Sequence, residues 1–340
     1  MSDPAVSVLV LAYGKEPLLT ECVDAILRSR EVRVEVVLVD NGCTSTSVTD
    51  VSSHADPRVR LLTPGNNTGF TGGCNLAAQH AVHPTLVLVN SDAIVAPDAI
   101  AHLVRRASSA GIATASVRLR EKPERINSAG NPVHFTGLSW AGGFGEPAEA
   151  HGTPHQVASA SGCAMAIRRD VWDRLEGFNE HMFAYGEDTE LSLRCWLAGW
   201  TVEFEPAAVV LHQYEFHRNP RKYYLLERNR LLTLLTVYEW RTLLLLLPVL
   251  LGLELGVLAI AARSGWLGEK VAGWTWLARH PRLIMRRRRF VQSRRVLTDR
   301  VLAEICTGDF TPGEIPDAPR AAFLSALCAL YWRLVRGLIR

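Results

Sequence analysis

The chain has 340 residues and a formal net charge of +3 at pH 7, from 37 lysines and arginines against 34 aspartates and glutamates. This small positive excess excludes a globally basic nucleic-acid-binding protein. Hydrophobic residues make up 48% of the chain and charged residues 21%, which excludes intrinsic disorder and suffices for a full core. The length predicts roughly two structural units.

In the first third of the chain, short apolar runs alternate with segments of helical spacing. The runs that predict buried strands are residues 6–11, 34–39, 59–62 and 86–89. Helices are predicted at 18–26, around 75–81 after a glycine-rich loop, and after Pro97. This alternation is typical of a doubly wound α/β domain, in which ligands bind beyond the carboxyl ends of the strands. Asp40 and Asp92 each follow such a strand end.

The middle of the chain, residues 111–215, is richer in glycine and turn signals. Its predicted elements are a strand at 114–119, a long loop or hairpin at 127–145, a helix at 187–199, and strands at 201–204 and 208–211. The last of these strands ends at His212. The α/β pattern therefore continues to about residue 215.

The character of the sequence changes after that point. Residues 242–262 are apolar except for Glu254, and the segment is long enough to span a bilayer. Residues 263–300 carry eleven lysines and arginines against two acids, and residues 321–340 predict a basic amphipathic helix. We expect these segments to associate with a membrane surface, as bound or partly inserted helices, and a buried helical subdomain is the alternative.

The seven cysteines are scattered and never spaced as CxxC. Neither a disulfide framework nor a structural zinc site is therefore expected, and a reducing cytosol is favoured. The first residues lack a basic flank and lead directly into a β-like stretch, so we expect no signal peptide there.

Several polar residues at element ends have both a structural and a functional interpretation. Asp40 is suited to an Asx-turn or to accepting hydrogen bonds from a nucleotide base. Asp92 is suited to a helix start or to a metal site. The pair Glu187 and Asp188 fits the first turn of a helix, whose dipole would keep Asp188 ionised for use as a general base. His212 alone indicates structure more often than a ligand, so only the group as a whole favours a site.

The order of the motifs is more specific than any single one. Along the chain stand VSVLVLAYG, VDNG, GNNTGFTGGCN, LVNSD, GCAMAIRRDVW, GFNEHMFAYGEDTELSLRCWLAGW and PAAVVLH. This series resembles the inverting family 2 glycosyltransferases of the GT-A fold, and among them the bacterial rhamnosyltransferase-like branch, over about residues 5 to 240. The resemblance implies an α/β, Rossmann-like nucleotide-diphospho-sugar transferase domain at 1–215, a hydrophobic helical segment at 216–262, and a basic amphipathic helical tail at 263–340.

The resemblance also implies residues for the nucleotide sugar. Asp40 would contact the base, with Tyr13 nearby, and Gly73 and Asn75 would line the site. Asn90 stands where the family's Asp-x-Asp element has its first Asp. An amide there offers no charge to a metal, although this branch often carries Asn at that position.

The same resemblance implies a metal site and a catalytic base. Asp92 and His212 would hold Mg²⁺ or Mn²⁺ on the diphosphate. Asp188 would take the proton from the acceptor hydroxyl in a single in-line displacement, and Glu187 would assist in binding the acceptor. A glycoside hydrolase would instead need a second carboxyl group as acid.

The implied function is transfer of rhamnose or a related hexose from a dTDP- or UDP-linked donor to a glycan or polyprenyl-linked acceptor. It would take place in cell-envelope polysaccharide synthesis, on the cytoplasmic face of the membrane and without nucleic acid. A UDP-hexose or galactofuranose donor is one alternative. A non-catalytic sugar- or lipid-binding scaffold on the same fold is the other.

Overall fold

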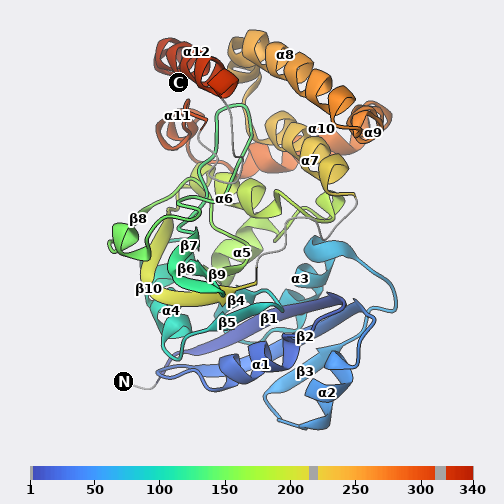
Figure 1. Cartoon of the computed structure of the whole chain (residues 1–340), viewed down its shortest axis with the longest axis vertical. Coiled ribbons are helices and arrows are strands. Elements are labelled where there is room, and N and C mark those ends of the chain that lie inside the picture. The colour runs from blue at the N-terminus through green and yellow to red at the C-terminus, as the bar shows by residue number, and fades with distance from the viewer. Residues whose placement is uncertain (1–2, 214–220, 311–318, 340) are drawn as a thin grey trace.

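The computed structural model describes residues 3–213, 221–310 and 319–339. Its centre is a ten-stranded mixed sheet in the order β3-β2-β1-β4-β9-β6-β10-β5, with β7 beside β6 and β8 beside β10 (Figure 1). The strands are β1 Ala5–Gly14, β2 Arg33–Cys43, β3 Val59–Leu62, β4 Thr85–Val89, β5 Ala93–Val95, β6 Ile112–Leu119, β7 Lys122–Ser128, β8 His155–Gln156, β9 Ala164–Arg168 and β10 Val202–His212.

The strand directions bring several strand ends to one edge of the sheet. β3, β2, β1 and β4 are parallel, β9 lies antiparallel between β4 and β6, and β10 is parallel to β6. The carboxyl ends of β1, β2, β4, β6 and β10 therefore point the same way. In open α/β sheets this is the edge at which ligands bind.

Helices cover both faces of the sheet. Along β1, Val8 and Val10 enter one apolar cluster and Leu9 enters the other, as expected for a strand buried on both faces. The first cluster takes residues from α1, α2 and α4, and the second takes residues from α3, α5 and α6. These helices are α1 Leu19–Leu27, α2 Ser47–Ser53, α3 Gly69–His80, α4 Ala99–Ser109, α5 Arg169–Leu175 and α6 Glu187–Leu197.

A group of helices caps the α6 side of the molecule (Figure 1). They are α7 Lys222–Val237, α8 Trp240–Arg263, α9 Leu267–Arg279, α10 Pro281–Arg294, α11 Arg300–Ile305 and α12 Pro319–Val335. The short 3₁₀ turns among the described residues are η1 Ala148–His151, η2 Glu180–Met182 and η3 Arg336–Leu338. Leu234, Leu302 and Trp332 belong to the same apolar cluster as α6, so these helices share the core of the sheet domain.

The structure corrects some sequence-based boundaries. The predicted glycine-rich loop is largely helical, because α3 begins at Gly69 and not near Asn75. The two strands predicted at 201–204 and 208–211 are one strand, β10, with an irregularity between Glu205 and Val209. The predicted domain boundary at 215/216 lies outside the described residues, and the one at 262/263 falls at the end of α8.

The apolar segment forms a single helix, α8. Among the described residues it alone is long and apolar enough to cross a membrane, judged by length and composition. Its most apolar window has a mean hydropathy of 2.6, and only 6% of that window is buried. The proline within it, Pro248, does not end the helix.

Candidate active site

The ends of β1 and β2 bring Tyr13 and Asp40 together. The strand register pairs Ala12 with Asp40, and the Tyr13 ring lies over Gly42, 3.7 Å from where a side chain at Gly42 would begin. Asp40 Oδ1 accepts hydrogen bonds from the backbone N–H groups of Gly42 and Cys43, at 3.2 and 2.8 Å. The Asx-turn interpretation is thus confirmed. Tyr13 is 53% exposed, so solvent reaches an aromatic side chain at the same strand end as that carboxylate.

Asn41, beside Asp40, organises the start of α3. Its side chain is buried, accepts hydrogen bonds from the Thr68 backbone and hydroxyl, and donates to Asn67 Oδ1 and the Gly69 carbonyl. The loop that leads into α3 is therefore fixed to the end of β2. Asn41 lies within the VDNG motif, but the local sequence carries no signal for this role.

Gly73 and Asn75 have structural contacts in the interior. A Cβ at Gly73 would lie 2.1 Å from Leu11 Cδ1, so the glycine lets α3 approach β1 closely. Asn75 Nδ2 donates to the Phe178 carbonyl and to Glu180 Oε1, both at 3.0 Å, and its Oδ1 accepts from the Phe178 N–H at 2.9 Å. Asn75 therefore holds the segment that precedes α6. The predicted contacts of both residues with a nucleotide sugar stay predictions.

Asp92 and His212 meet where β4 and β10 end. His212 Nε2 lies 3.3 Å from Asp92 Oδ1, and His212 Nδ1 lies 2.8 Å from Asn127 Oδ1. Burial opposes the charged imidazole, but Cys163 and the Asp92 carboxylate outweigh it and raise the pKa of His212 to about 10. The sequence placed each of these two residues at the end of a strand, and the structure brings them into contact.

The loop before β9 links the metal candidates to the catalytic candidates. The Asn90 N–H donates to the Cys163 carbonyl at 2.9 Å, and the Gly162 N–H donates to Asp188 Oδ2 at 3.0 Å. Two successive residues of one loop therefore hold Asn90 on one side and Asp188 on the other. The motif GCAMAIRRDVW contains this loop, but the sequence did not indicate its position.

Glu187 and Asp188 open helix α6, as predicted. Glu187 is buried, and its Oε2 has no hydrogen-bond partner among the described residues. Burial, with the neighbouring Asp188 charge, raises the pKa of Glu187 to about 8. Burial also raises the pKa of Asp188, against hydrogen bonds from Gly162 and Thr189 that lower it. The position of Asp188 at the start of a helix, which favours the charged form, therefore does not outweigh the effect of burial on its pKa. A raised pKa makes Asp188 a stronger base.

The loop before this pair is strained and held from α7. Phe183 and Tyr185 have φ values of 66° and 70°, a region that costs non-glycine residues about 1–3 kcal/mol each. Asn229 Nδ2 donates to the carbonyls of Met182, Ala184 and Tyr185 at 2.9, 2.9 and 2.7 Å. These hydrogen bonds offset the backbone strain, and α7 thereby positions the start of α6.

The donor set at Asp92 and His212 fits a divalent cation that also binds phosphate. Among the described residues no group of three or more His, Cys, Asp or Glu side chains is placed to hold a metal. One carboxylate and one imidazole leave several coordination positions for diphosphate oxygens and water, as Mg²⁺ sites that bind substrate phosphates usually do. Binding would require the imidazole in its neutral form.

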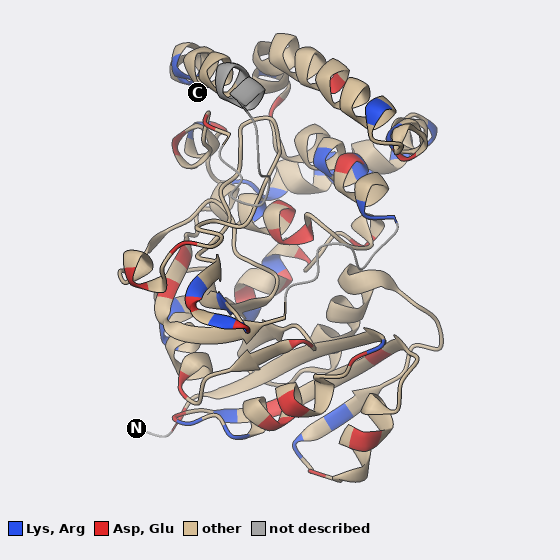
Figure 2. Cartoon of the chain, viewed as in Figure 1, with Lys and Arg blue, Asp and Glu red and all other residues tan. Residues whose placement is uncertain are grey.

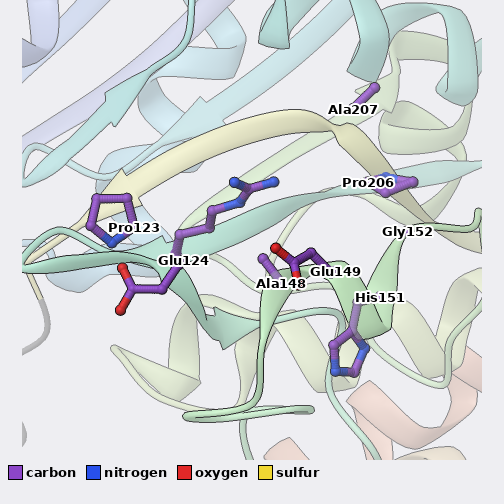
Figure 3. A pocket seen from close by; sticks show the side chains of 9 residues that line it. Pro123, Glu124, Ala148, Glu149, His151, Gly152, Pro206 and Ala207 are labelled. Carbon is purple, nitrogen blue, oxygen red and sulfur yellow. The ribbon is translucent and has the colours of Figure 1, made fainter.

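A cavity of about 560 Å³ lies away from these residues, between β7, η1 and the irregular part of β10 (Figure 3). Arg118, Glu124, Glu149 and His151 contribute polar side chains to it, and Pro206 lines its rim. It contains none of the predicted site residues. Its size alone is therefore no reason to move the site from the strand ends.

A comparison with protein families decides the class. The model described as glycosyltransferase like family 2 matches residues 4–231, which include every predicted site residue. The chain is a family 2 glycosyltransferase. The predicted α/β fold, with a GT-A-like domain followed by a helical region, is confirmed, and so is the assignment as an enzyme.

Two curated relatives of this glycosyltransferase come from bacteria. An N-acetylglucosaminyl-diphospho-decaprenol L-rhamnosyltransferase of Mycobacterium tuberculosis is 27% identical over 235 residues, 60% of this chain and 75% of that protein. The O-antigen biosynthesis protein RfbC of Myxococcus xanthus is 28% identical over 201 residues, 56% of this chain and 16% of that one. The resemblance to the rhamnosyltransferase-like branch is thus confirmed.

Two solved structures share the fold of the glycosyltransferase. GalNAc-T7 with UDP, GalNAc and Mn²⁺ has a TM-score of 0.59 at 16% identity, over 70% of this chain and 48% of that one. The mannosyltransferase PcManGT from Pyrobaculum calidifontis, in complex with GDP-Man and Mn²⁺, has a TM-score of 0.51 at 16% identity, over 97% and 86%. Likeness at this identity concerns the fold alone.

Proposed function

We propose that this glycosyltransferase moves L-rhamnose or a related hexose from a nucleoside-diphosphate donor to a polyprenyl-diphosphate-linked glycan in cell-envelope synthesis. The relative from Mycobacterium tuberculosis, named as acting on a decaprenol-linked acceptor, supports the substrate class. The loop 162–163 carries the proposal most directly, since it holds Asp188 beside the strand ends that carry Asn90 and Asp92. The reaction takes place on the cytoplasmic face, where nucleotide sugars are available.

The chain's own residues perform the displacement. The Asp188 carboxylate takes the proton from the acceptor hydroxyl while that oxygen attacks the anomeric carbon, and the nucleoside diphosphate departs from the opposite face. Glu187, with its raised pKa, is protonated at neutral pH and can donate a hydrogen bond to the acceptor. A single base suffices for an inverting reaction, because the diphosphate leaves without protonation by a second acid.

The donor lies across the ends of β1, β2 and β4. Tyr13 and Asp40 hold the base, as the exposed ring and the turn carboxylate beside it allow. Asp92 and His212 would hold Mg²⁺ or Mn²⁺, which when bound would neutralise charge on the departing diphosphate. Asn90 contributes no charge, and its backbone fixes the loop that faces Asp188.

Donor turnover tests this proposal. The purified enzyme is incubated with dTDP-, UDP- and GDP-sugars and a short-chain polyprenyl-diphosphate glycan, with Mg²⁺ or Mn²⁺ and with EDTA, and nucleoside diphosphate release is measured. We expect metal-dependent release from one donor, and Asp188→Asn to lower kcat by about 10²- to 10⁴-fold. Asp170→Asn, at an exposed aspartate paired with Arg168, is the matched control and should keep full activity.

The outcomes separate the alternatives. Turnover of a UDP-hexose or a galactofuranose donor in place of dTDP-rhamnose would change the sugar and keep the class. Full activity of Asp188→Asn would remove Asp188 from its role as base. Binding of nucleotide and acceptor without any turnover would favour the non-catalytic scaffold.

A further inference from the structure

Two helices expose matching stripes of leucine. On α8 the exposed leucines are Leu244, Leu247, Leu251 and Leu255, and on α12 and the turn after it they are Leu327, Leu330, Leu334 and Leu338. Both sets have the same spacing of three, four and four residues, which lines up one face of a helix. Leu244 and Leu334 are 69% and 68% exposed. We call these eight residues the leucine face.

The two helices that carry the leucine face are neighbours. The Tyr331 hydroxyl of α12 donates a hydrogen bond to the Leu245 carbonyl of α8. On its other side α12 is anchored by Trp332, whose ring stacks on Phe135 with centroids 4.6 Å apart. Both helices lie at the end of the molecule opposite β1–β3 (Figure 1). The two exposed stripes thus lie on neighbouring helices that are both anchored to the protein.

Charges fix α8 to its neighbours through Glu254, at the flank of the leucine stripe. Glu254 accepts hydrogen bonds from Arg230, from Lys270 at 2.8 Å and from the Trp274 indole at 2.7 Å. Lys270 is fully buried and also pairs with Glu227. Crossing a bilayer would pull Glu254 away from these partners and leave buried charges unpaired. Despite its length, α8 therefore has one side bound to protein and one side open.

Cations border the leucine face. Arg241 and Arg263 stand near the two ends of α8, and Arg333 and Arg336 lie between Leu330 and Leu338 on α12 and η3; all four are exposed. Glu254 is the only acid in either helix, and it is already paired. In Figure 2 most of the described length of both helices carries no charged side chain. An apolar strip with arginines at its margins is complementary to an anionic lipid surface.

We propose that α8 and α12 lie together in the plane of an anionic bilayer, with the leucine face at the boundary between headgroups and acyl chains and the four arginines at the lipid phosphates. The choice of a bilayer as occupant, over a second copy of the chain, rests on those arginines and on the lipid-linked acceptor of the proposed function. The helix α8, which carries part of the leucine face, is joined through α7 to the start of α6.

Vesicle flotation of the full chain tests this surface. We expect the protein to float with vesicles of phosphatidylglycerol and phosphatidylcholine, and much less with phosphatidylcholine alone. The triple variant Leu244→Gln, Leu251→Gln, Leu334→Gln should bind at least about tenfold more weakly. Leu61→Gln with Val82→Gln, which changes exposed apolar residues far from the leucine face, should bind as the unchanged protein does.

A second variant keeps the test decisive if the leucine variant does not fold. Arg241→Gln with Arg333→Gln and Arg336→Gln should remove most of the preference for anionic vesicles. Vesicle binding that neither variant changes would overturn the proposal. So would retention of the protein in membranes at alkaline pH, because a helix lying in the plane is released and a spanning helix is not.

Two further measurements distinguish this proposal from its rival and from the proposed function. A dimer in solution that the leucine variant dissociates, together with no vesicle binding, would assign the face to a second copy and overturn the lipid proposal. Nucleoside diphosphate release with a water-soluble acceptor analogue should be unchanged in the leucine variant. Vesicle binding without any such release, in the unchanged protein, would contradict the proposed function and leave the docking surface standing.

Discussion

The side-chain amide of Asn229 donates a hydrogen bond of 2.7 Å to the carbonyl of Tyr185, two residues before Glu187. Its neighbour Arg228 donates to the carbonyls of His181 and Met182 in the same loop. The residues on either side, Glu227 and Arg230, belong to the cluster of charges that binds Glu254 of α8. Four consecutive residues of α7 therefore join the leucine-bearing helix to the loop before α6, which we call the catalytic loop for the role proposed for Asp188.

Asn229→Ala should lower kcat by more than its loss of stability would explain. The loop carbonyls lose their donor, the strained residues of the loop relax, and Asp188 shifts relative to Gly162. The lost bonds should cost about 1–3 kcal/mol in the free energy of unfolding. Denaturant unfolding and steady-state turnover measure the two effects.

Gln292→Ala is the matched control for that variant. Its side-chain amide also donates to two backbone carbonyls, those of Thr236 and Val237, but far from the catalytic loop. It should reduce stability similarly and leave kcat unchanged. An equal fall of kcat in both variants would contradict a positioning role for Asn229.

Gly69→Ala should damage the catalytic loop, whereas Gly65→Ala should not. Both glycines have positive φ, at 73° and 81°, so both substitutions strain the backbone by about 1 kcal/mol. A Cβ at Gly69 would also lie 2.5 Å from the Phe183 carbonyl oxygen, while nothing lies within 4 Å of one at Gly65. We expect a larger loss of thermal stability and a lower kcat for Gly69→Ala alone. Equal behaviour of the two variants would show that α3 does not support the loop.

Glu187→Gln should stabilise the protein at alkaline pH. The folded protein holds a proton on Glu187 up to about pH 8, while the unfolded chain releases it near 4.5. Folding stability of the unchanged protein therefore falls as pH rises through that window, and the amide removes this cost. Thermal unfolding should show little difference at pH 5 and a gain on the order of a few kcal/mol at pH 9. A gain that is independent of pH would contradict the buried, protonated carboxyl.

Lys270→Met should destabilise the protein by about 3–5 kcal/mol, because it leaves Glu227 and Glu254 sharing Arg230 alone in a buried site. Adding Glu254→Leu to this variant removes the surplus charge and should restore part of the loss. Chemical denaturation of the single and double variants measures the coupling. If the double variant lost more stability than the two single variants lose in total, one closed charge cluster would be contradicted.

The sequence predicted the sheet domain well because its strands are short, apolar and regularly spaced. The polar ends of those strands could be placed at one edge from the topology rule alone, and Asp92 and His212 do meet there. Contacts between segments far apart in the chain could not be predicted from the sequence. The loop 162–163 lies between two strand ends only because β9 inserts antiparallel between β4 and β6, and local spacing carries no signal for that.

The glycines show the same limit. Four glycines in the run from Gly65 to Gly73 predicted a loop near a ligand, since glycine allows a close approach of backbone. The structure uses that freedom for packing: Gly73 meets Leu11 and Gly69 meets Phe183. Pattern alone could not distinguish a close approach to a ligand from one to a neighbouring strand.

The charge cluster around Glu254 has a consequence for synthesis of the chain. Lys270 follows Glu254 by sixteen residues, and Arg230 precedes it by twenty-four. As the chain leaves the ribosome, the apolar helix is therefore complete before the lysine that closes its polar side. For that interval α8 resembles a membrane anchor to the insertion machinery. Retention of the helix by its own protein would then require α9 to pack on α7 before insertion begins.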